Sequence, residues 1–152
     1  MILSPAAESD WEDIRRLSVQ IHDLHAAWRT DIYFHTDEPY PKARFLEDSA
    51  KGLLYVTRQD NSVLGYVVLA ILEKGGPGTV AVRQLRLESI CVDETCRGQG
   101  IGKAMMADIP LIASMLNCTS LVLGVHPENQ SALRFYESCG FSVRTINMEK
   151  KL

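Results

Sequence analysis

The sequence predicts one mixed α/β domain, residues 1–152, with antiparallel strands first, a β-α-β unit later and helices on both faces of the sheet. Three observations predict this fold: a helical apolar stripe near the start, three successive apolar segments joined by turn residues, and a later alternation of helix and strand patterns. The expected order is β-α-α-β-β-β-α-β-α-β. A chain of 152 residues fits one core, and no repeat or linker divides it.

The first half of the chain is expected to hold a short strand at residues 2–4 and two helices. Ser9 and Glu12 have the spacing of a capping box, so the first helix should begin there and run to Trp28 along an apolar stripe. Periodicity then fails over residues 30–41, where aromatic side chains either line a pocket or anchor the loop to the core. A short helix follows around residues 42–50.

Three antiparallel strands should occupy the middle of the chain. Segments 53–57 and 63–72 are rich in β-branched and apolar residues, and turn residues 59–62 join them as a hairpin. The run Gly75-Gly76-Pro77-Gly78 closes a second hairpin onto residues 80–92.

The last part of the chain predicts helix, strand, helix and strand. A helical stripe spans residues 101–116, and Pro110 should kink or interrupt it because proline lacks a backbone donor. Segment 121–125 is expected to be a short buried strand. Asn129 and Tyr136 fall on one face of the next helix, Gly140 can end that helix in a left-handed conformation, and residues 141–152 should form a final strand.

Composition argues against several classes of function. The net charge is −3 and no stretch clusters Lys and Arg, so no nucleic-acid partner is expected. The longest apolar run, residues 66–72, is far too short for a membrane span, and the N-terminus has no signal-peptide character. The four cysteines form no C-x-x-C pair and have no His at zinc-ligand spacing. We therefore expect a soluble cytoplasmic protein with reduced thiols and no metal site.

The segment CRGQGIGKAM, residues 96–105, places three glycines where a strand ends and a helix starts. The first amides of a helix lack internal partners and carry the positive end of its dipole, and glycines let an anion approach them. Phosphate is the natural ligand, and Arg97 and Lys103 can add charge. A dinucleotide fingerprint would need glycine at position 103, and a P-loop would need glycine at 97 and Ser or Thr at 104, so both fail.

The pattern Arg97-x-x-Gly100-x-Gly102, preceded by Ile90-Cys91-Val92-Asp93, resembles the acyl-CoA signature of the GNAT superfamily of N-acetyltransferases. The later segment Asn129-x-x-Ala132-x-x-x-Tyr136-x-x-x-Gly140-Phe141 resembles the second cofactor segment of that superfamily, and the order of elements agrees over nearly the whole chain. The resemblance implies a GNAT-like fold. It also implies transfer of the acetyl group of acetyl-CoA to an amine, in a small molecule or a peptide, by direct attack in a ternary complex.

The resemblance implies roles for particular residues. The pyrophosphate would rest on the amides of the strand-helix corner, and pantetheine would pair with the backbone of the fourth strand, which must splay from residues 121–125. The Val92 amide would donate to the thioester carbonyl, Asn129 would contact pantetheine, and Tyr136 would protonate the departing thiolate. The cofactor-binding residues so implied are Ile90, Cys91, Val92, Arg97, Gly98, Gln99, Gly100, Ile101, Gly102, Lys103, Asn129, Ala132 and Tyr136.

The residue that accepts the proton of the amine stays open. Many relatives carry a Glu on the fifth strand, whereas this chain has Gly124 there. Counting by two from Val92 places Glu88 on the face of Ile90, Arg86 and Gln84, so it is the first candidate, unless it only pairs with Arg86. His126 comes next. Cys91 could carry the acetyl group covalently, but alternation points it away from Ile90, which favours direct transfer.

The acceptor is expected near Trp28, Asp31, Tyr33, Phe34 and His126, and an acidic chain mildly favours a cationic amine. Two other classes of function remain open: an acyl-CoA sensor without catalysis and a nucleotide-binding switch. The predicted final strand is shorter than the two-strand ending common in the superfamily, so strand exchange or a homodimer would complete the sheet.

Overall fold

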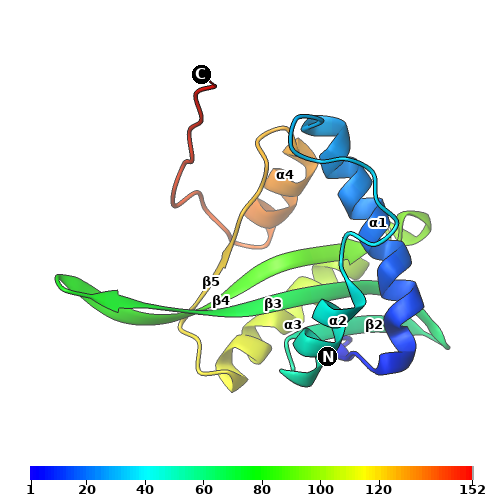
Figure 1. Ribbon diagram of the computed structural model, residues 1–152. Helices are drawn as coiled ribbons and strands as arrows, with labels where there is room; N and C mark the ends of the chain where they lie inside the picture. The colour runs from blue at the N-terminus through cyan, green and yellow to red at the C-terminus, as the bar shows by residue number, and fades with distance from the viewer. Residues whose placement is uncertain (152) are drawn as a thin grey trace.

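The computed structural model describes residues 1–151 and confirms a mixed, mostly antiparallel sheet with helices on both faces (Figure 1). The strands lie in the order β1 (Ser4–Pro5), β2 (Leu54–Gln59), β3 (Ser62–Gly76), β4 (Thr79–Val92) and β5 (Ser120–Leu123). The first four strands pair antiparallel, and β5 lies parallel to β4. The parallel pair needs a crossover, which the helix between β4 and β5 supplies.

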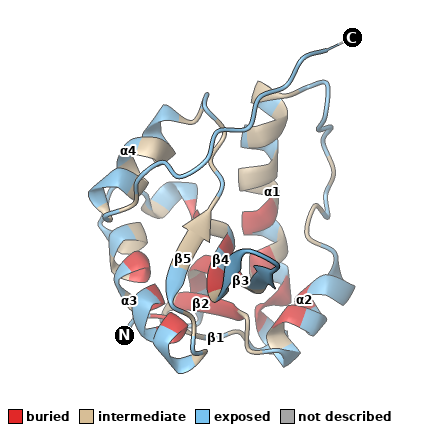
Figure 2. Cartoon of the chain, turned by 90° about the vertical axis from the view of Figure 1, so that its left-hand side faces the viewer, coloured by how far each residue is buried: buried red, intermediate tan, exposed pale blue. Residues whose placement is uncertain are grey.

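Two layers of helices cover the sheet. Helices α1 (Trp11–Trp28) and α2 (Lys42–Ala50) pack Ile14, Leu17 and Phe45 on one face, and α3 (Ile101–Met115) and α4 (Gln130–Ser138) cover the other. Short 3-10 helices, η1 (Glu8–Asp10) and η2 (Glu94–Cys96), precede α1 and α3. Buried residues gather on the inner sides of α1, α2 and α3 and in the strands between them (Figure 2). Within residues 1–151 no helix combines the length and the apolar character that crossing a membrane requires.

The capping box predicted for the first helix is wrong. The Ala7 N–H donates to the Asp10 carboxylate at 2.7 Å, and α1 begins at Trp11, one residue later. Asp10 is buried and is also held by Arg58 of β2. A buried carboxylate with a guanidinium partner therefore organises this helix start in place of Ser9, which is exposed.

Pro110 does not interrupt α3, which is one helix from Ile101 to Met115, so of the two predicted effects the interruption is wrong. A proline inside a helix costs about 3 kcal/mol. Ile109 and Ile112, on either side of it, are each about 1% exposed. Burying two such side chains contributes about 1.5–3 kcal/mol each, which offsets the lost hydrogen bond.

The predicted final strand is also wrong: residues 141–151 form neither helix nor strand, and Leu152 lies outside the described residues. This C-terminal tail leaves the end of α4, bends away from the sheet and rises past α4 to the C-terminus (Figure 1). Near its end Glu149 pairs with Arg29 at 3.0 Å, and Lys151 pairs with Asp31 at 2.6 Å. These ion pairs place the end of the tail beside the end of α1.

Candidate functional site

The strands β4 and β5 separate, as the resemblance implied, and leave a gap in the sheet. Their pairing covers only Gln84–Leu87 with Ser120–Leu123, whereas β4 stays paired with β3 up to Val92. The Asp93 N–H donates to the Leu64 carbonyl at 2.8 Å. Because this bond lies one residue beyond the opposed residues Gly65 and Val92, those two form a non-hydrogen-bonded pair of the ladder. In an antiparallel ladder such pairs alternate, so the N–H and C=O groups of Val92 and Ile90 point away from β3, into the gap.

The Val92 carbonyl is already contacted from the gap side. The Arg97 guanidinium donates to it from Nε at 3.0 Å and lies 3.4 Å from Oε1 of Gln20 on α1. Arg97 is otherwise exposed. A carbonyl oxygen has two lone pairs, so a ligand that pairs with the Val92 carbonyl either shares it with Arg97 or takes its place.

Beyond the gap, the glycine corner presents a row of free amides at the start of α3. Gly98 and Gly100 have φ values of +78° and +83°, and Gly100 is the left-handed N-cap of the helix. The first helical bond runs from Ala104 N–H to the Gly100 carbonyl, at 3.0 Å. None of the N–H groups of residues 99–103 donates a hydrogen bond to another residue of the described range 1–151. Together with the helix dipole, these amides form an anion-binding site.

Gly102 brings three elements together beneath this corner. A Cβ at Gly102 would lie 3.5 Å from the Phe135 ring of α4 and 3.7 Å from the Val92 side chain of β4. Only a residue with a very small side chain allows α3 to lie so near both neighbours. A methyl group fits here at ordinary contact distances, so position 102 accepts Gly or Ala and excludes larger side chains.

Helix α1 fixes the loop that leads into the corner. Asp93 is buried, and its carboxylate accepts from the Thr95 N–H at 3.0 Å, from the Thr95 hydroxyl at 2.8 Å and from the Arg16 guanidinium. The Arg16 guanidinium, with the Thr95 donors, lowers the pKa of Asp93 to about 2. The Gln20 side chain accepts from the Glu94 N–H at 3.0 Å. Sequence reasoning missed Arg16 and Gln20, since only the tertiary structure brings their face of α1 to this loop.

Helix α4 carries the two polar residues of the predicted second cofactor segment. The Asn129 Oδ1 caps the helix by accepting from the Ala132 N–H at 3.0 Å and the Ser131 hydroxyl at 3.0 Å. Tyr136 is half-buried, with ring-centroid distances of 5.3 Å to Phe135 and 5.9 Å to Phe141. Its hydroxyl makes no hydrogen bond within residues 1–151. Burial raises the pKa of Tyr136 to about 12, so the phenol keeps its proton at neutral pH.

The placement of Glu88 on the face of Ile90 is wrong, because β4 has a bulge there. Ser89 lies opposite Val68 and Leu87 lies opposite Leu69, which leaves Glu88 as the extra residue. A bulge reverses the alternation of faces, so counting by two from Val92 fails at this point. The Glu88 carboxylate pairs with Arg86 at 3.1 Å and is exposed.

Glu88 instead lines a cavity of about 280 Å³ on the α2 side of the sheet, which we call the bulge pocket. Its other walls are the loop residues Pro39, Tyr40 and Pro41, Arg44 of α2, Val68 of β3 and Ser89 of β4. The Tyr40 hydroxyl donates to Asp48 at 2.8 Å, which fixes the ring. Burial raises the pKa of Tyr40 well above its usual range.

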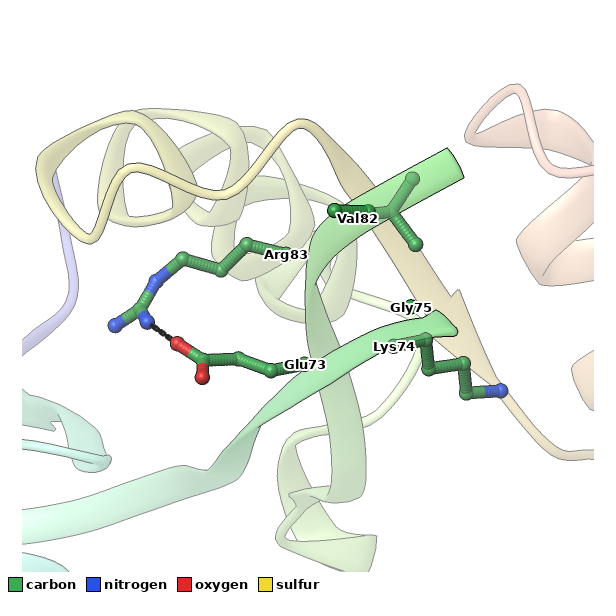
Figure 3. A pocket seen from close by; sticks show the side chains of 6 residues that line it. Glu73, Lys74, Gly75, Val82 and Arg83 are labelled. Atoms are coloured by element: carbon green, nitrogen blue, oxygen red, sulfur yellow. Dashed lines mark hydrogen bonds and ion pairs between the residues drawn. The ribbon is translucent and has the colours of Figure 1, made fainter. Parts of the chain in front are cut away.

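A second depression, of about 480 Å³, lies at the far end of the β3–β4 hairpin (Figure 3). The side chains of Glu73 and Arg83 form an ion pair across it, and Lys74 points outward. It contains none of the predicted site residues. It lies on the opposite side of the β4–β5 pairing from the gap, so it is not part of the candidate site.

The residues predicted to contact an acceptor form an aromatic cluster around the end of α1. The Trp28 and His126 rings stack with a centroid distance of 6.0 Å, so the loop after β5 meets α1. Tyr33 lies 5.8 Å from the His22 ring and 6.0 Å from the His25 ring. Phe34 is exposed, and the Asp31 carboxylate is taken up by Arg29 and Lys151.

Two candidate side chains are constrained by their hydrogen bonds or burial. The His126 Nδ1 accepts from the Glu128 N–H at 3.3 Å, which places the proton of a neutral ring on Nε2. Cys91 is buried under α1, its Sγ lies 3.5 Å from the Leu17 carbonyl, and burial raises its pKa to about 11. Its backbone pairs with Tyr66 of β3. Cys91 is therefore the one predicted cofactor residue of β4 that does not face the gap.

Comparison with known proteins gives concordant matches. The model of the Acetyltransferase (GNAT) family matches residues 19–141. A Drosophila melanogaster protein named "Probable glucosamine 6-phosphate N-acetyltransferase" is 31% identical over 102 residues, which are 64% of this chain and 44% of that protein. The chain spans about half the length of the curated relatives it matches.

Solved structures share the whole fold. The tetramutant of the BH1408 protein from Bacillus halodurans superposes with a TM-score of 0.93 at 26% identity, over 100% of both chains. The aminoglycoside N-acetyltransferase AAC(6')-Iy in complex with CoA superposes with a TM-score of 0.70 at 18% identity, over 99% of both chains. The second likeness is one of fold.

Proposed function

We propose that this chain, which belongs to the Acetyltransferase (GNAT) family, transfers the acetyl group of acetyl-CoA to an amine by direct attack in a ternary complex. The observation that carries the proposal is the continuity of the gap and the corner. The backbone of Ile90 and Val92, which pairs through these edge groups with neither β3 nor β5, leads directly to the free amides of residues 99–103. An extended amide-containing chain that ends in a diphosphate matches this sequence of donors and acceptors.

The residues present fit coenzyme A in two places. The amides of residues 99–103 would hold the diphosphate, with Lys103 nearby to add charge. The N–H and C=O groups of Ile90 and the C=O of Val92 would pair with the pantetheine amides, the Val92 carbonyl sharing its second lone pair with Arg97 or losing that contact. Acetyl-CoA supplies an activated thioester. The Val92 N–H would donate to its carbonyl oxygen, where negative charge grows, and one such donor contributes about 3 kcal/mol.

Two proton transfers need side chains. The Tyr136 hydroxyl, protonated at neutral pH and without a partner, would donate to the departing thiolate. Glu88 is the preferred base because its carboxylate is exposed beside the bulge pocket, whereas the Nδ1 of His126 is already an acceptor. Cys91 has the wrong orientation and a raised pKa for a covalent route.

The acceptor amine would enter by the bulge pocket. Glu88 offers it a carboxylate and Tyr40 an aromatic wall, which suits a cationic amine. The Trp28 and His126 stack would contact the part of the acceptor that extends toward α1. Asp31 is unsuited to bind it while Arg29 and Lys151 neutralise its charge.

A panel of amines with thiol detection of released coenzyme A tests the proposal. Amine-dependent release and intersecting double-reciprocal plots are expected, and Glu88→Gln should lower kcat about 100-fold or more. Arg86→Gln is the matched control, because it removes the partner of Glu88 and keeps the carboxylate. Parallel double-reciprocal plots would contradict direct transfer. A wild-type rate in Glu88→Gln on the best amine would remove the base assignment.

A further inference from the structure

Arg44 gives the bulge pocket a positive charge that the proposed chemistry does not use. Its Nε donates to the Asp48 Oδ2 at 2.7 Å, whereas its two terminal nitrogens donate to no residue within the described range 1–151. The Arg44 side chain lines the pocket and is 49% exposed, so a ligand can reach it. The paired N–H donors of a guanidinium match the oxygens of a carboxylate or a phosphate. Arg44 is therefore able to bind an anionic group in the pocket.

Arg44 is held in place by a buried group. The Asp48 side chain is 3% exposed, and its Oδ2 also accepts from the Tyr40 hydroxyl at 2.8 Å. The Tyr40 ring stacks on the Tyr66 ring with a centroid distance of 6.5 Å, and the Tyr66 hydroxyl shares a hydrogen bond of 3.1 Å with the Ser89 hydroxyl. Arg44, Tyr40 and Ser89 all line the pocket, so one chain of contacts connects its walls. A charged side chain that is fixed beforehand loses little freedom when it binds an anion.

The negative charge of the pocket lies on another element. The Glu88 carboxylate pairs with Arg86 of its own strand at 3.1 Å, and Arg44 pairs with Asp48 of its own helix. A molecule in the pocket therefore meets a carboxylate from β4 and a guanidinium from α2. The cavity of about 280 Å³ is at the small end of the range for ligand pockets. It suits a small molecule that carries one charge of each sign.

We propose that the acceptor is a small amine that also carries a carboxylate or a phosphate, and that the two terminal nitrogens of Arg44 bind this anionic group while the amine lies at Glu88. The inference rests on the proposed acetyl transfer, because that proposal assigns the bulge pocket to the acceptor. With one charge at each end, the acceptor has a single favourable orientation in the pocket, and the amine is the end that meets Glu88. Arg44 thus determines specificity without touching the reacting atoms.

Matched pairs of amines test the inference by steady-state kinetics. Amino acids are compared with their amides, and O-phosphoethanolamine is compared with ethanolamine, so that a preference within either kind of pair also identifies the anionic group. For at least one pair, the wild-type kcat/KM should be at least about 10-fold higher for the anionic member, because hydrogen bonds between charged groups are the strong ones. Comparing the same two amines in wild type and variant cancels their difference in basicity.

Three variants locate the preference. Arg44→Gln should largely abolish it, and Arg44→Lys, which keeps the charge without the paired donors, should have an intermediate preference. Lys42→Gln is the matched control, because it removes the same charge from the first turn of α2 but does not line the pocket, so its preference should equal that of the wild type. Circular dichroism and acetyl-CoA binding check that each variant is folded. If Arg44→Gln does not fold, the wild-type preference and Arg44→Lys decide the outcome.

A binding measurement separates this inference from the proposed function. The Arg44 Nε–H that Asp48 holds can be followed by NMR, and Arg44→Lys identifies its signal by removing it. In protein saturated with coenzyme A, the anionic amines should shift this signal with saturation, and their neutral partners should not. A shift without acetylation of any amine would support the anion site and contradict the transfer. Equal acetylation of both members of every pair, or a preference that persists in Arg44→Gln, overturns the inference and leaves the transfer intact.

Discussion

Replacing Arg16 by Leu removes the guanidinium that holds Asp93, and the structure gives the size of the expected loss. The Asp93 side chain is 9% exposed, and its pKa is lowered from an ordinary value of 3.8 to about 2. At 1.36 kcal/mol per pKa unit, the whole shift corresponds to about 2 kcal/mol. Part of this free energy belongs to the Thr95 donors. The Arg16 side chain is 45% exposed, so solvent screening reduces the part that belongs to Arg16. We therefore expect Arg16→Leu to lower the free energy of unfolding by about 1–2 kcal/mol at pH 7.

Urea denaturation followed by circular dichroism measures this change. Arg15→Leu is the matched control, since Arg15 forms a surface pair with Glu12 and its loss should cost less than about 0.5 kcal/mol. A lowered carboxylate pKa stabilises the fold above the unfolded pKa, so the contribution of the pair is complete above about pH 4 and disappears as the pH falls to about 2. Equal stability of the two variants at pH 7, or an Arg16→Leu deficit that persists at pH 2, would refute this reasoning.

Three further predictions concern the site. Tyr136→Phe should lower kcat about 100-fold or more with little change in the KM for acetyl-CoA, and steady-state kinetics with an unchanged kcat would remove the acid role. The Gly102→Val side chain should overlap the Phe135 ring and Val92, which lowers the free energy of unfolding by about 1–3 kcal/mol and weakens acetyl-CoA binding. The methyl group of Gly102→Ala fits at ordinary contact distances, so this variant is the control. Calorimetry compares the two variants. Arg97→Ala removes the contact with the Val92 carbonyl and one positive charge at the corner. The acetyl-CoA affinity of the wild-type protein should therefore fall with rising salt more than that of the variant. A wild-type affinity that does not fall with rising salt would show that the charge contributes little.

The fold was largely predictable because local patterns and tertiary packing agree. The helical stripes of α1 and α3 and the turn residues of both hairpins place those elements within a few residues of their observed ends. The prediction failed where a distant group decided the outcome. Pro110 stays helical because its neighbours are buried, and the C-terminal tail follows ion pairs with Arg29 and Asp31 that no local pattern shows.

The glycine corner was predictable because it depends on backbone conformation, which glycine positions reveal, whereas the gap was implied only by the resemblance to the GNAT superfamily. The position of Glu88 was not, because a bulge of one residue reverses the faces of a strand and leaves no signal in an alternating sequence. The roles of Arg16 and Gln20 were missed for another reason. On α1 they appear as solvated polar residues, and they act on Asp93 and Glu94 only once the chain has folded.

Calorimetric titration with two ligands tests the central claim, that free amides at the start of α3 hold the diphosphate of coenzyme A. Acetyl-CoA should bind at one site per chain with saturation. S-acetylpantetheine, which has the same thioester arm but lacks the diphosphate and the 3′-phosphoadenosine attached to it, should bind about 100-fold more weakly, because hydrogen bonds to a charged group contribute about 1.5–3 kcal/mol each. Equal affinities for the two ligands, or no heat with acetyl-CoA at millimolar concentration on folded protein, would contradict the claim.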